Sequence, residues 1–278
     1  MPKLLIRKLE CFAKLPDEAK RALEGMVREV KQFGARQDII GEGEKPDDVH
    51  LIVEGWAARY KMLPNGDHPI LAYLIPGDLC DIQVSLLQRM DHSIGTLSPC
   101  KVAVIPHAEI ARLLREHESL SRALWWSTLV DEAILREWLV SVGHRSADKR
   151  LAHFICEMLL RCKAVGLTDD DSFSMPLTQE EIGQTMGLST VHVNRTLQDL
   201  RAQGLIVSTG KRMVVNDLDR LLDFAEFNAN YLHQQAGLPA RAGPPRRRER
   251  GQAGLRRLDE RPRPWPVNAG ARVVALLT

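Results

Sequence analysis

In the C-terminal half of the chain, two short helical patterns carry polar side chains at their starts. Thr178 and Glu181 have the spacing of a capping box, which predicts a helix beginning at about Gln179. Gly187 is suited to the tight turn that ends this helix, because glycine adopts positive φ without strain. Ser189 is placed to cap a second helix. Two short helices joined by a glycine turn are typical of a helix-turn-helix.

The second of these helices has one apolar face and one face that suits DNA bases. Val193, Leu197 and Leu200 recur at i, i+4 and i+7, so we expect them to face the core. The opposite face presents Thr190, Val191, Asn194 and Arg195. Arginine can bridge two acceptors of guanine, asparagine can pair with adenine, and a methyl group can contact thymine. We also assign Thr178, Ser189 and His192 to the DNA-binding surface, the last two for phosphate contacts.

Two apolar runs follow these helices, Gly204–Val207 and Met213–Val215, separated by Ser208–Arg212. They predict a two-stranded wing with Lys211 and Arg212 at its basic tip, where they can reach DNA. An ordinary helical hairpin would explain the two helices alone. The caps, the glycine turn, the apolar register and the basic wing together favour a winged helix-turn-helix.

The elements that position this module begin with a long helix. The chain has neither Gly nor Pro from Ser119 to Val142, and an apolar stripe there is wide enough for more than one packing partner. One interpretation is a dimerisation helix, and the other, equally supported by the periodicity, is a core helix of a monomer. The segment Gly143–Ser146 is a hinge candidate, and a further helix starts at Ala147. The residues assigned to dimerisation are Leu120, Leu124, Thr128, Leu135 and Trp138.

The N-terminal part changes from helical to strand-like texture. Residues 1–30 are expected to form short helices, with a start at Leu15–Glu18 and with Val30 in the helical apolar spacing. Residues 31–106 show short apolar runs separated by glycines, and Pro64–Asp67 is a hairpin-turn signal. This pattern predicts an all-β roll or sandwich.

Composition and charge narrow the function classes. The 278 residues carry a net charge of +2, and the segment 237–278 holds ten Arg against three acidic residues, which leaves about −5 for the first 236. That Arg- and Pro-rich tail cannot bury a core and is expected to be disordered. Five scattered cysteines form no disulfide framework, and we see neither a membrane-spanning run nor a signal peptide, so a cytoplasmic protein is expected.

The order of β-roll, long helix and winged helix resembles the Crp/Fnr superfamily of transcription regulators over about residues 10–230. The motifs that carry the resemblance are Glu181–Gln184, Gly204–Ile206, Gly41–Gly43, Leu51–Gly55 and Pro76–Asp78. It implies an α+β protein that binds palindromic double-stranded DNA as a homodimer and contacts RNA polymerase. The expected domains are 1–118 for the N-terminal helices and effector-type β-roll, 119–145 for the dimerisation helix and hinge, 146–236 for the winged helix and 237–278 for the tail.

The chain departs from the cyclic-nucleotide and iron–sulfur branches of this family. The family's cassette places Gly-Glu after Gly-Asp and Arg-Ser downstream, whereas here Asp81 and Ile82 replace the first pair and His92 replaces the arginine. We therefore predict poor binding of cyclic AMP, no metal, no cofactor and an effector that is unknown. Only Cys11 lies where the iron–sulfur branch has several cysteines. The effector-loop candidates are Gly77, Asp78, Cys80, Asp81, His92 and Ser93.

In the recognition helix, Val191 stands where the family often has a glutamate, so the preferred half-site should differ from the family's commonest one.

Other function classes have weaker support in the sequence. His117 and Glu118 begin a metalloprotease-like motif, but Ser121 stands where its second histidine should be. Phosphate-binding and nucleophile-elbow motifs are missing from the sequence, so an enzyme is not predicted. A heme- or redox-responsive sensor of the same fold is the alternative, with His68, His92 or Cys80 as its ligands.

Overall fold

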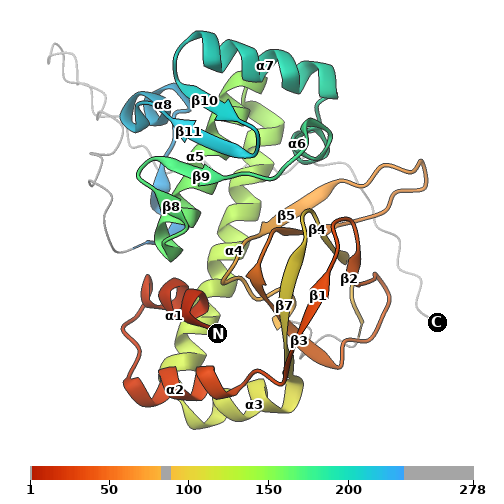
Figure 1. Cartoon of the computed structure of the whole chain (residues 1–278), viewed down its shortest axis with the longest axis vertical. Helices are drawn as coiled ribbons and strands as arrows, with labels where there is room; N and C mark the ends of the chain where they lie inside the picture. Colours follow the sequence, from red (N-terminus) through yellow and green to blue (C-terminus); the bar gives the residue numbers. More distant parts are fainter. Residues whose placement is uncertain (1, 83–88, 235–278) are drawn as a thin grey trace, which may run out of the picture. The chain divides into compact units, whose positions relative to one another are not determined.

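The computed structural model describes residues 2–82 and 89–234, which begin with two short helices. Helix α1 spans Lys3–Glu10 and helix α2 spans Asp17–Gly25 (Figure 1). Val30 does not extend the helical segment as expected, because it pairs with Ala103 in an antiparallel ladder and lies in strand β1. The segment 237–278, expected to be disordered, lies outside the described residues.

The β-roll consists of two antiparallel sheets, with strand orders β1-β7-β3 and β2-β6-β4-β5. Short strands separated by glycine turns build it, as the sequence predicted. The turn at residues 64–67 joins β4 to β5, which pair in antiparallel register. The strands are β1 (Glu29–Phe33), β2 (Asp38–Ile40), β3 (Asp48–Glu54), β4 (Ala57–Tyr60), β5 (Ile70–Leu74), β6 (Ser93–Thr96) and β7 (Cys100–Pro106).

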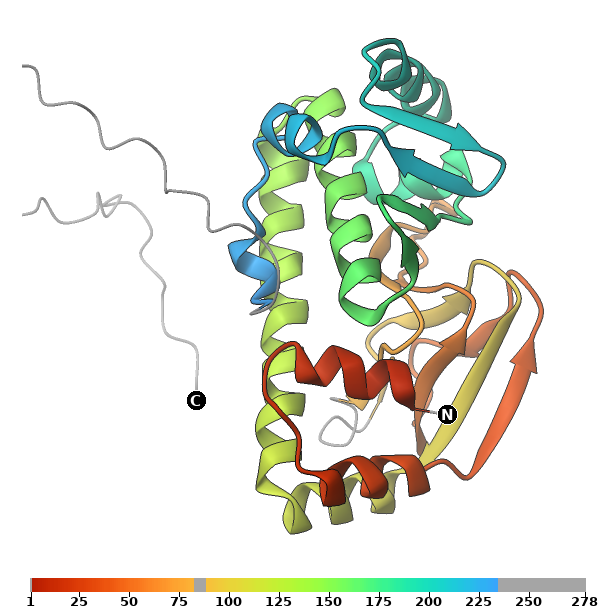
Figure 2. The ribbon, with the colours of Figure 1, turned by 60° about the vertical axis from the view of Figure 1, so that its left-hand side comes forward.

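Three helices follow the roll. Helix α3 spans His107–Glu116, α4 spans Glu118–His144 and α5 spans Ala147–Val165. The break between α4 and α5 falls at Arg145 and Ser146, within the segment that the sequence marked as a hinge. Figure 2 shows α4 as a long helix that runs past both the roll and the C-terminal module.

The C-terminal module places two helices over a small sheet of strand order β10-β11-β9-β8. The predicted two-stranded wing is β10 and β11, and the sheet also contains β8 and β9, which the sequence did not reveal. Tyr73 of the roll and Phe154 of α5 belong to one continuous apolar core, so the roll and this module form one compact unit. The elements are β8 (Thr168–Asp169), β9 (Ser172–Ser174), α6 (Gln179–Met186), α7 (Thr190–Ala202), β10 (Ile206–Thr209) and β11 (Arg212–Val215).

Beyond the sheet, α8 (Leu218–Phe224) is followed by the short helix η2 (Ala229–Leu232). Helix η2 packs against α4 (Figure 2). Phe227 and Leu232 are buried there, and the Tyr231 hydroxyl donates to Glu157 of α5 over 3.0 Å. We call residues 225–234 the C-terminal strap.

No helix among the described residues is both long and apolar enough to cross a membrane. The domain boundaries expected after residues 118 and 145 stay a prediction, since residues on both sides of them share one apolar core, and the boundary expected after residue 236 lies outside the described residues.

Candidate DNA-binding interface and effector region

Side-chain caps fix the starts of the two helices of the helix-turn-helix. The Thr178 hydroxyl accepts from the Glu181 amide over 3.1 Å, and the Glu181 carboxylate accepts from the Thr178 amide over 2.7 Å. Gly187 has a φ of +64° and ends α6, and the Ser189 hydroxyl accepts from the His192 amide at the start of α7. The predicted capping box, glycine turn and second cap are confirmed.

The contact between α6 and α7 is apolar and close. Val193, Leu197 and Leu200 are buried, as their spacing predicted. At Gly183, an added Cβ would lie 2.5 Å from the carbonyl oxygen of Leu188, so α6 approaches the turn closely at this position. These contacts hold α7 in a fixed orientation and leave its opposite face to solvent.

The exposed face of α7 presents the side chains that the sequence assigned to base contacts. Val191 is 79% exposed, so its methyl groups are available for contact. Thr190 and Arg195 are also exposed, and within residues 2–82 and 89–234 Arg195 makes no hydrogen bond or ion pair. Asn194 is half-buried, and its amide donates to the Gln179 side chain of α6 over 3.0 Å.

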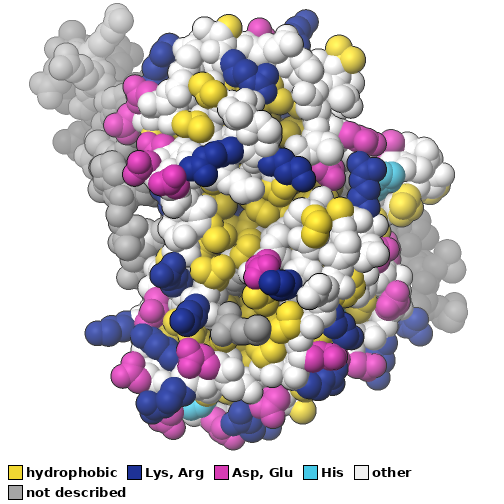
Figure 3. Space-filling view, in the orientation of Figure 1, with side chains coloured by type: hydrophobic (Ala, Val, Ile, Leu, Met, Phe, Trp, Pro, Cys, Tyr) yellow, Lys and Arg dark blue, Asp and Glu magenta, His cyan; other side chains and the backbone are white. Residues whose placement is uncertain are grey.

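The wing adds basic groups beside α7. Lys211 is exposed at the turn between β10 and β11, where Gly210 has a φ of +58°. The Arg212 guanidinium contacts Asp169 and Ser172 of the adjoining strands, so this arginine is held by the wing's own sheet. Figure 3 shows Lys and Arg side chains over the upper part of the molecule, where Figure 1 places α7 and the β10–β11 hairpin.

The apolar side chains that α4 exposes differ in part from those that the sequence assigned to dimerisation. Leu120 and Leu124 are buried within the protomer against the N-terminal helices and the roll, so they have no surface to offer a second copy. Trp138 is directed inward and its Nε1 donates to Glu157 over 3.0 Å. Their assignment to dimerisation is corrected, because periodicity gives the width of an apolar stripe but not the partner of each row.

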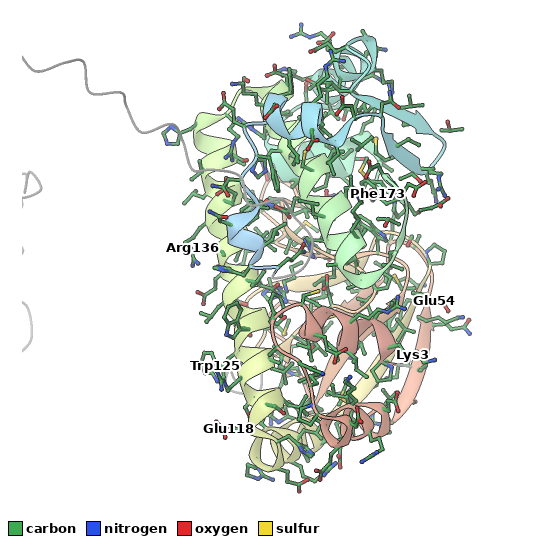
Figure 4. The ribbon with its side chains drawn as sticks, turned by 90° about the vertical axis from the view of Figure 1, so that its left-hand side faces the viewer. Lys3, Glu54, Glu118, Trp125, Arg136 and Phe173 are labelled. Carbon is green, nitrogen blue, oxygen red and sulfur yellow. The ribbon has the colours of Figure 1, made fainter. Side chains whose placement is uncertain are left out.

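Thr128 and Leu135 lie nearer the outer face of α4. Leu135 is 45% exposed, and Thr128 is half-buried with its hydroxyl bonded to the backbone of its own helix. Five further apolar side chains of α4 are between 45% and 75% exposed and were not among the residues assigned to dimerisation: Trp125, Leu129, Leu139, Val140 and Val142. Figure 4 shows Trp125 and Arg136 pointing away from the protomer along this helix.

The loop after β5 holds a buried carboxylate that is fully paired. Gly77 has a φ of +99° and lies against the backbone of Leu4 in α1. Asp78 accepts from Lys8 over 2.7 Å and from Arg161 of α5 over 3.0 Å. Although burial raises the pKa of Asp78, these two cations outweigh it and hold the pKa below its ordinary value. Asp78 therefore joins the roll to α1 and α5.

Asp81, which replaces glycine of the family's cassette, is also used internally. Its side chain is fully buried and accepts from both the amide and the ring Nδ1 of His50, over 2.8 and 2.7 Å. Cys80 beside it is buried, and burial raises the pKa of its thiol well above the ordinary value. A thiol in that state is protonated at neutral pH and is a poor redox switch.

An arginine that the sequence analysis did not single out fills the space beside this loop. Arg59 of β4 is buried, and its guanidinium donates to the carbonyl oxygens of Cys80 and Leu79 over 3.0 and 3.4 Å. It also lies 3.4 Å from the carboxylate of Asp131 on α4. Arg59 thus joins the effector loop to the long helix. A charged residue within the apolar run Trp56–Met62 was the available signal.

The remaining effector-loop candidates do not complete a cyclic-nucleotide site. His92 pairs with its neighbour Asp91 over 2.6 Å, and the Ser93 hydroxyl accepts from the Glu42 amide. A cyclic nucleotide needs a carboxylate for its ribose and a guanidinium for its phosphate, but the Asp81 and Arg59 groups already have protein partners. The described residues of this region therefore do not fit a cyclic nucleotide.

Neither does the described part of the chain bring together three or more His, Cys, Asp or Glu side chains in a metal-binding arrangement. His68 is exposed on the turn between β4 and β5 and belongs to no such group within the described residues.

Two family models match the regions just described. The Crp-like helix-turn-helix domain matches residues 149–224, and the cyclic nucleotide-binding domain matches residues 30–117. The chain belongs to the Crp/Fnr family. The family consists of transcription regulators, and this chain is accordingly a DNA-binding transcription regulator with a cyclic-nucleotide-binding-like roll.

Several relatives of this Crp/Fnr regulator are named as transcriptional activators. It is 25% identical over 224 residues to the transcriptional activator protein FnrL of Cereibacter sphaeroides, covering 79% of this chain and 89% of that protein. It is 27% identical over 233 residues to the transcriptional activatory protein AadR of Rhodopseudomonas palustris, covering 81% and 90%. The solved structure of FixK2 from Bradyrhizobium japonicum shares the fold, with a TM-score of 0.63 and 23% identity over 70% of this chain and 96% of that one.

Proposed function

We propose that this Crp/Fnr regulator binds a two-fold symmetric DNA site as a homodimer without needing a small-molecule effector. Helix α7 would enter the major groove, and the wing would contact the adjacent backbone. The observation that carries the proposal is the contrast between Arg195, which is exposed and unpaired within residues 2–82 and 89–234, and Arg59, which is buried and paired.

The ligand-independent part of the proposal rests on the effector region. A small-molecule effector would have to form or change contacts between the loop and the neighbouring helices in order to act on this roll. Here Arg59 links the Cys80 carbonyl to Asp131, and Arg161 links Asp78 to α5. Buried charged groups that already have partners gain little from a new ligand, because binding would have to break those contacts first.

The homodimer would form through the outer face of α4. Leu135, Leu139 and Val142 recur at i, i+4 and i+7 and are between 45% and 75% exposed. A two-fold dimer would present its two α7 helices to half-sites about one helical turn apart.

We further propose that the bound dimer contacts RNA polymerase and activates transcription. The printed names of FnrL and AadR describe activators, and both relatives align over about four fifths of this chain.

The test of the proposed function is selection of genomic DNA fragments by the purified protein with no small molecule added. Enrichment of a palindrome is expected. Enrichment only after a cell extract is added would contradict the ligand-independent part, and no enrichment under either condition would contradict the DNA-binding arrangement itself.

Dimerisation is tested by Leu139→Glu, which places a charge at the most exposed apolar position of α4. We expect the variant to sediment as a monomer and to lose affinity for the palindrome by more than tenfold, because each half-site is then bound by a separate monomer. Val207→Glu, at a 45% exposed position of the wing, is the matched control and should stay dimeric. A dimeric Leu139→Glu would show that another surface mediates assembly.

A further inference from the structure

One hydrogen bond joins the recognition helix to the first residue of the preceding helix. The Asn194 Nδ2 atom of α7 donates to Oε1 of Gln179, the first residue of α6, over 3.0 Å. Both side chains are half-buried. The two residues are 15 positions apart and lie on opposite sides of the glycine turn.

This hydrogen bond is not required to hold the two helices together. Val193 is fully buried between them, and Gly183 lets the turn approach α6 closely. A hydrogen bond between two half-exposed amides adds only about 1 kcal/mol to such a contact. What it fixes is the side-chain conformation of Asn194, whose amide would otherwise rotate freely toward solvent.

The Asn194 side chain still has a free donor and a free acceptor with which to recognise a base. Asparagine recognises adenine by accepting from N6 with its carbonyl oxygen and donating to N7 with its amide. Asn194 gives one of its two amide hydrogens to Gln179 and retains the other, together with the carbonyl oxygen. The amide nitrogen of Gln179 is still a donor and can reach a phosphate at the edge of the groove.

We propose that Gln179 is a positioning residue for base recognition: by holding the Asn194 amide in one orientation, it gives this regulator a preference for adenine at one position of each half-site. This inference rests on the proposed function, because it needs α7 in the major groove. Arg195 and Val191 would read neighbouring positions independently of Gln179.

The experiment measures affinity for the selected palindrome and for the same palindrome with each half-site position changed in turn. Four proteins are compared with the wild type: Gln179→Ala, Asn194→Ala, the double variant and Gln179→Glu. We expect Gln179→Ala and Asn194→Ala to lose discrimination at the same base pair, each by about tenfold. The double variant should lose no more than Asn194→Ala alone, since the two groups act as one unit.

The conservative variant separates positioning from simple packing. Gln179→Glu keeps an oxygen that accepts from Asn194, so it should retain the base preference even as its new charge lowers affinity for all sequences. Gln203→Ala, at the exposed C-terminal end of α7, is the matched control and should change neither affinity nor preference.

Two results would overturn the inference. An unchanged base preference in Gln179→Ala shows that Asn194 needs no support from Gln179. A loss of affinity that is uniform across all sequences shows that Gln179 only contacts phosphate. If the wild-type protein selects no sequence, the proposed function fails and this inference falls with it, whereas selection with unaltered preference in the variant overturns this inference alone.

Discussion

The outer face of α7 and the loop at Asp78–Asp81 are both rich in polar groups, yet they use those groups in opposite ways. On α7, Arg195 and Thr190 face solvent, whereas Asn194 is engaged by the side chain of Gln179. In the loop, Asp78 and Asp81 are buried and each accepts from protein donors. Both regions lie in the parts of the chain that family models match.

The difference underlies the proposal that the α7 surface, and not the loop at Asp78–Asp81, is available for binding. A site recognises a ligand through hydrogen-bonding capacity that the folded protein leaves unused. The α7 surface retains that capacity, and the described part of the effector region has used it to join the roll to α1, α4 and α5. We therefore expect mutations in the loop to change stability, and mutations on α7 to change DNA binding.

The largest expected effect follows from removing a buried cation. Arg161→Met removes one cationic partner from each of two buried carboxylates, Asp78 and Glu157, and should lower the free energy of unfolding by about 3–5 kcal/mol. Urea unfolding at a fixed protein concentration measures it. Arg136→Met is the control, since Arg136 is exposed on α4 and should cost less than about 0.5 kcal/mol. Equal costs for the two variants would refute the structural role of the loop network.

The next effect concerns DNA affinity. Arg195→Ala should weaken binding to the selected palindrome by about 1–3 kcal/mol and relax the preference at one base pair, because a bidentate contact to guanine is lost. Its unfolding free energy should stay within about 0.5 kcal/mol of the wild type, since the side chain is exposed. Electrophoretic mobility shifts and urea unfolding check the two halves. Unchanged affinity would contradict the assignment of Arg195.

A smaller effect depends on pH. Burial, together with the charge of Arg145, lowers the pKa of His153 from 6.5 to about 3. His153 is 2% exposed and lies against Phe227 of the strap, and its Nε2 is 3.4 Å from Glu137 without forming a hydrogen bond. Between pH 6.5 and about 3, the unfolded chain binds a proton at His153 that the folded chain does not.

The titration of His153 therefore leaves the free energy of unfolding unchanged above pH 6.5. Below pH 6.5 it lowers that free energy as the pH falls, by at most about 1.4 kcal/mol per pH unit. His153→Gln should reduce that slope in urea unfolding between pH 5 and 7. His144→Gln, at the exposed end of α4, should leave it unchanged. Identical slopes for the wild type and His153→Gln would show that His153 has the same pKa in the folded and the unfolded chain.

The smallest expected effect is that of cyclic AMP. At a concentration of about 1 mM it should raise the unfolding free energy by less than about 0.1 kcal/mol, because a ligand well below its dissociation constant stabilises hardly at all. Thermal denaturation with and without the nucleotide measures it. A rise of several degrees in Tm would mean that the effector region rearranges to admit the ligand, and would remove the contrast between the two regions.

Local sequence signals predicted the DNA-binding module well. The capping box at Thr178, the glycine turn at Gly187 and the cap at Ser189 all depend on residues a few positions apart, and each is confirmed. The β4–β5 hairpin followed from its turn residues in the same way. The roles of the exposed α7 residues in base contacts stay predictions, because side-chain exposure alone does not establish a DNA contact.

Contacts between distant segments could not be predicted. Arg59 and Asp131 are 72 positions apart, and Arg161 and Asp78 are 83 apart, so no local pattern joins them. For the same reason the periodicity of α4 did not show that Leu120 and Leu124 are covered by the protomer's own N-terminal helices. A single sequence indicates which side chains are apolar enough to be buried but not which distant segment buries them.

The C-terminal strap also bears on how the chain is made. Because the N-terminus of a protein leaves the ribosome first, the roll and α4 can fold before Tyr231 and His233 have been synthesised. The ring of His233 lies 5.7 Å from that of Trp126, and Tyr231 bonds to Glu157, so one side of α4 receives its cover among the last contacts to form. A nascent chain therefore passes through a stage in which α4 has already been synthesised while the strap that covers one side of it has not.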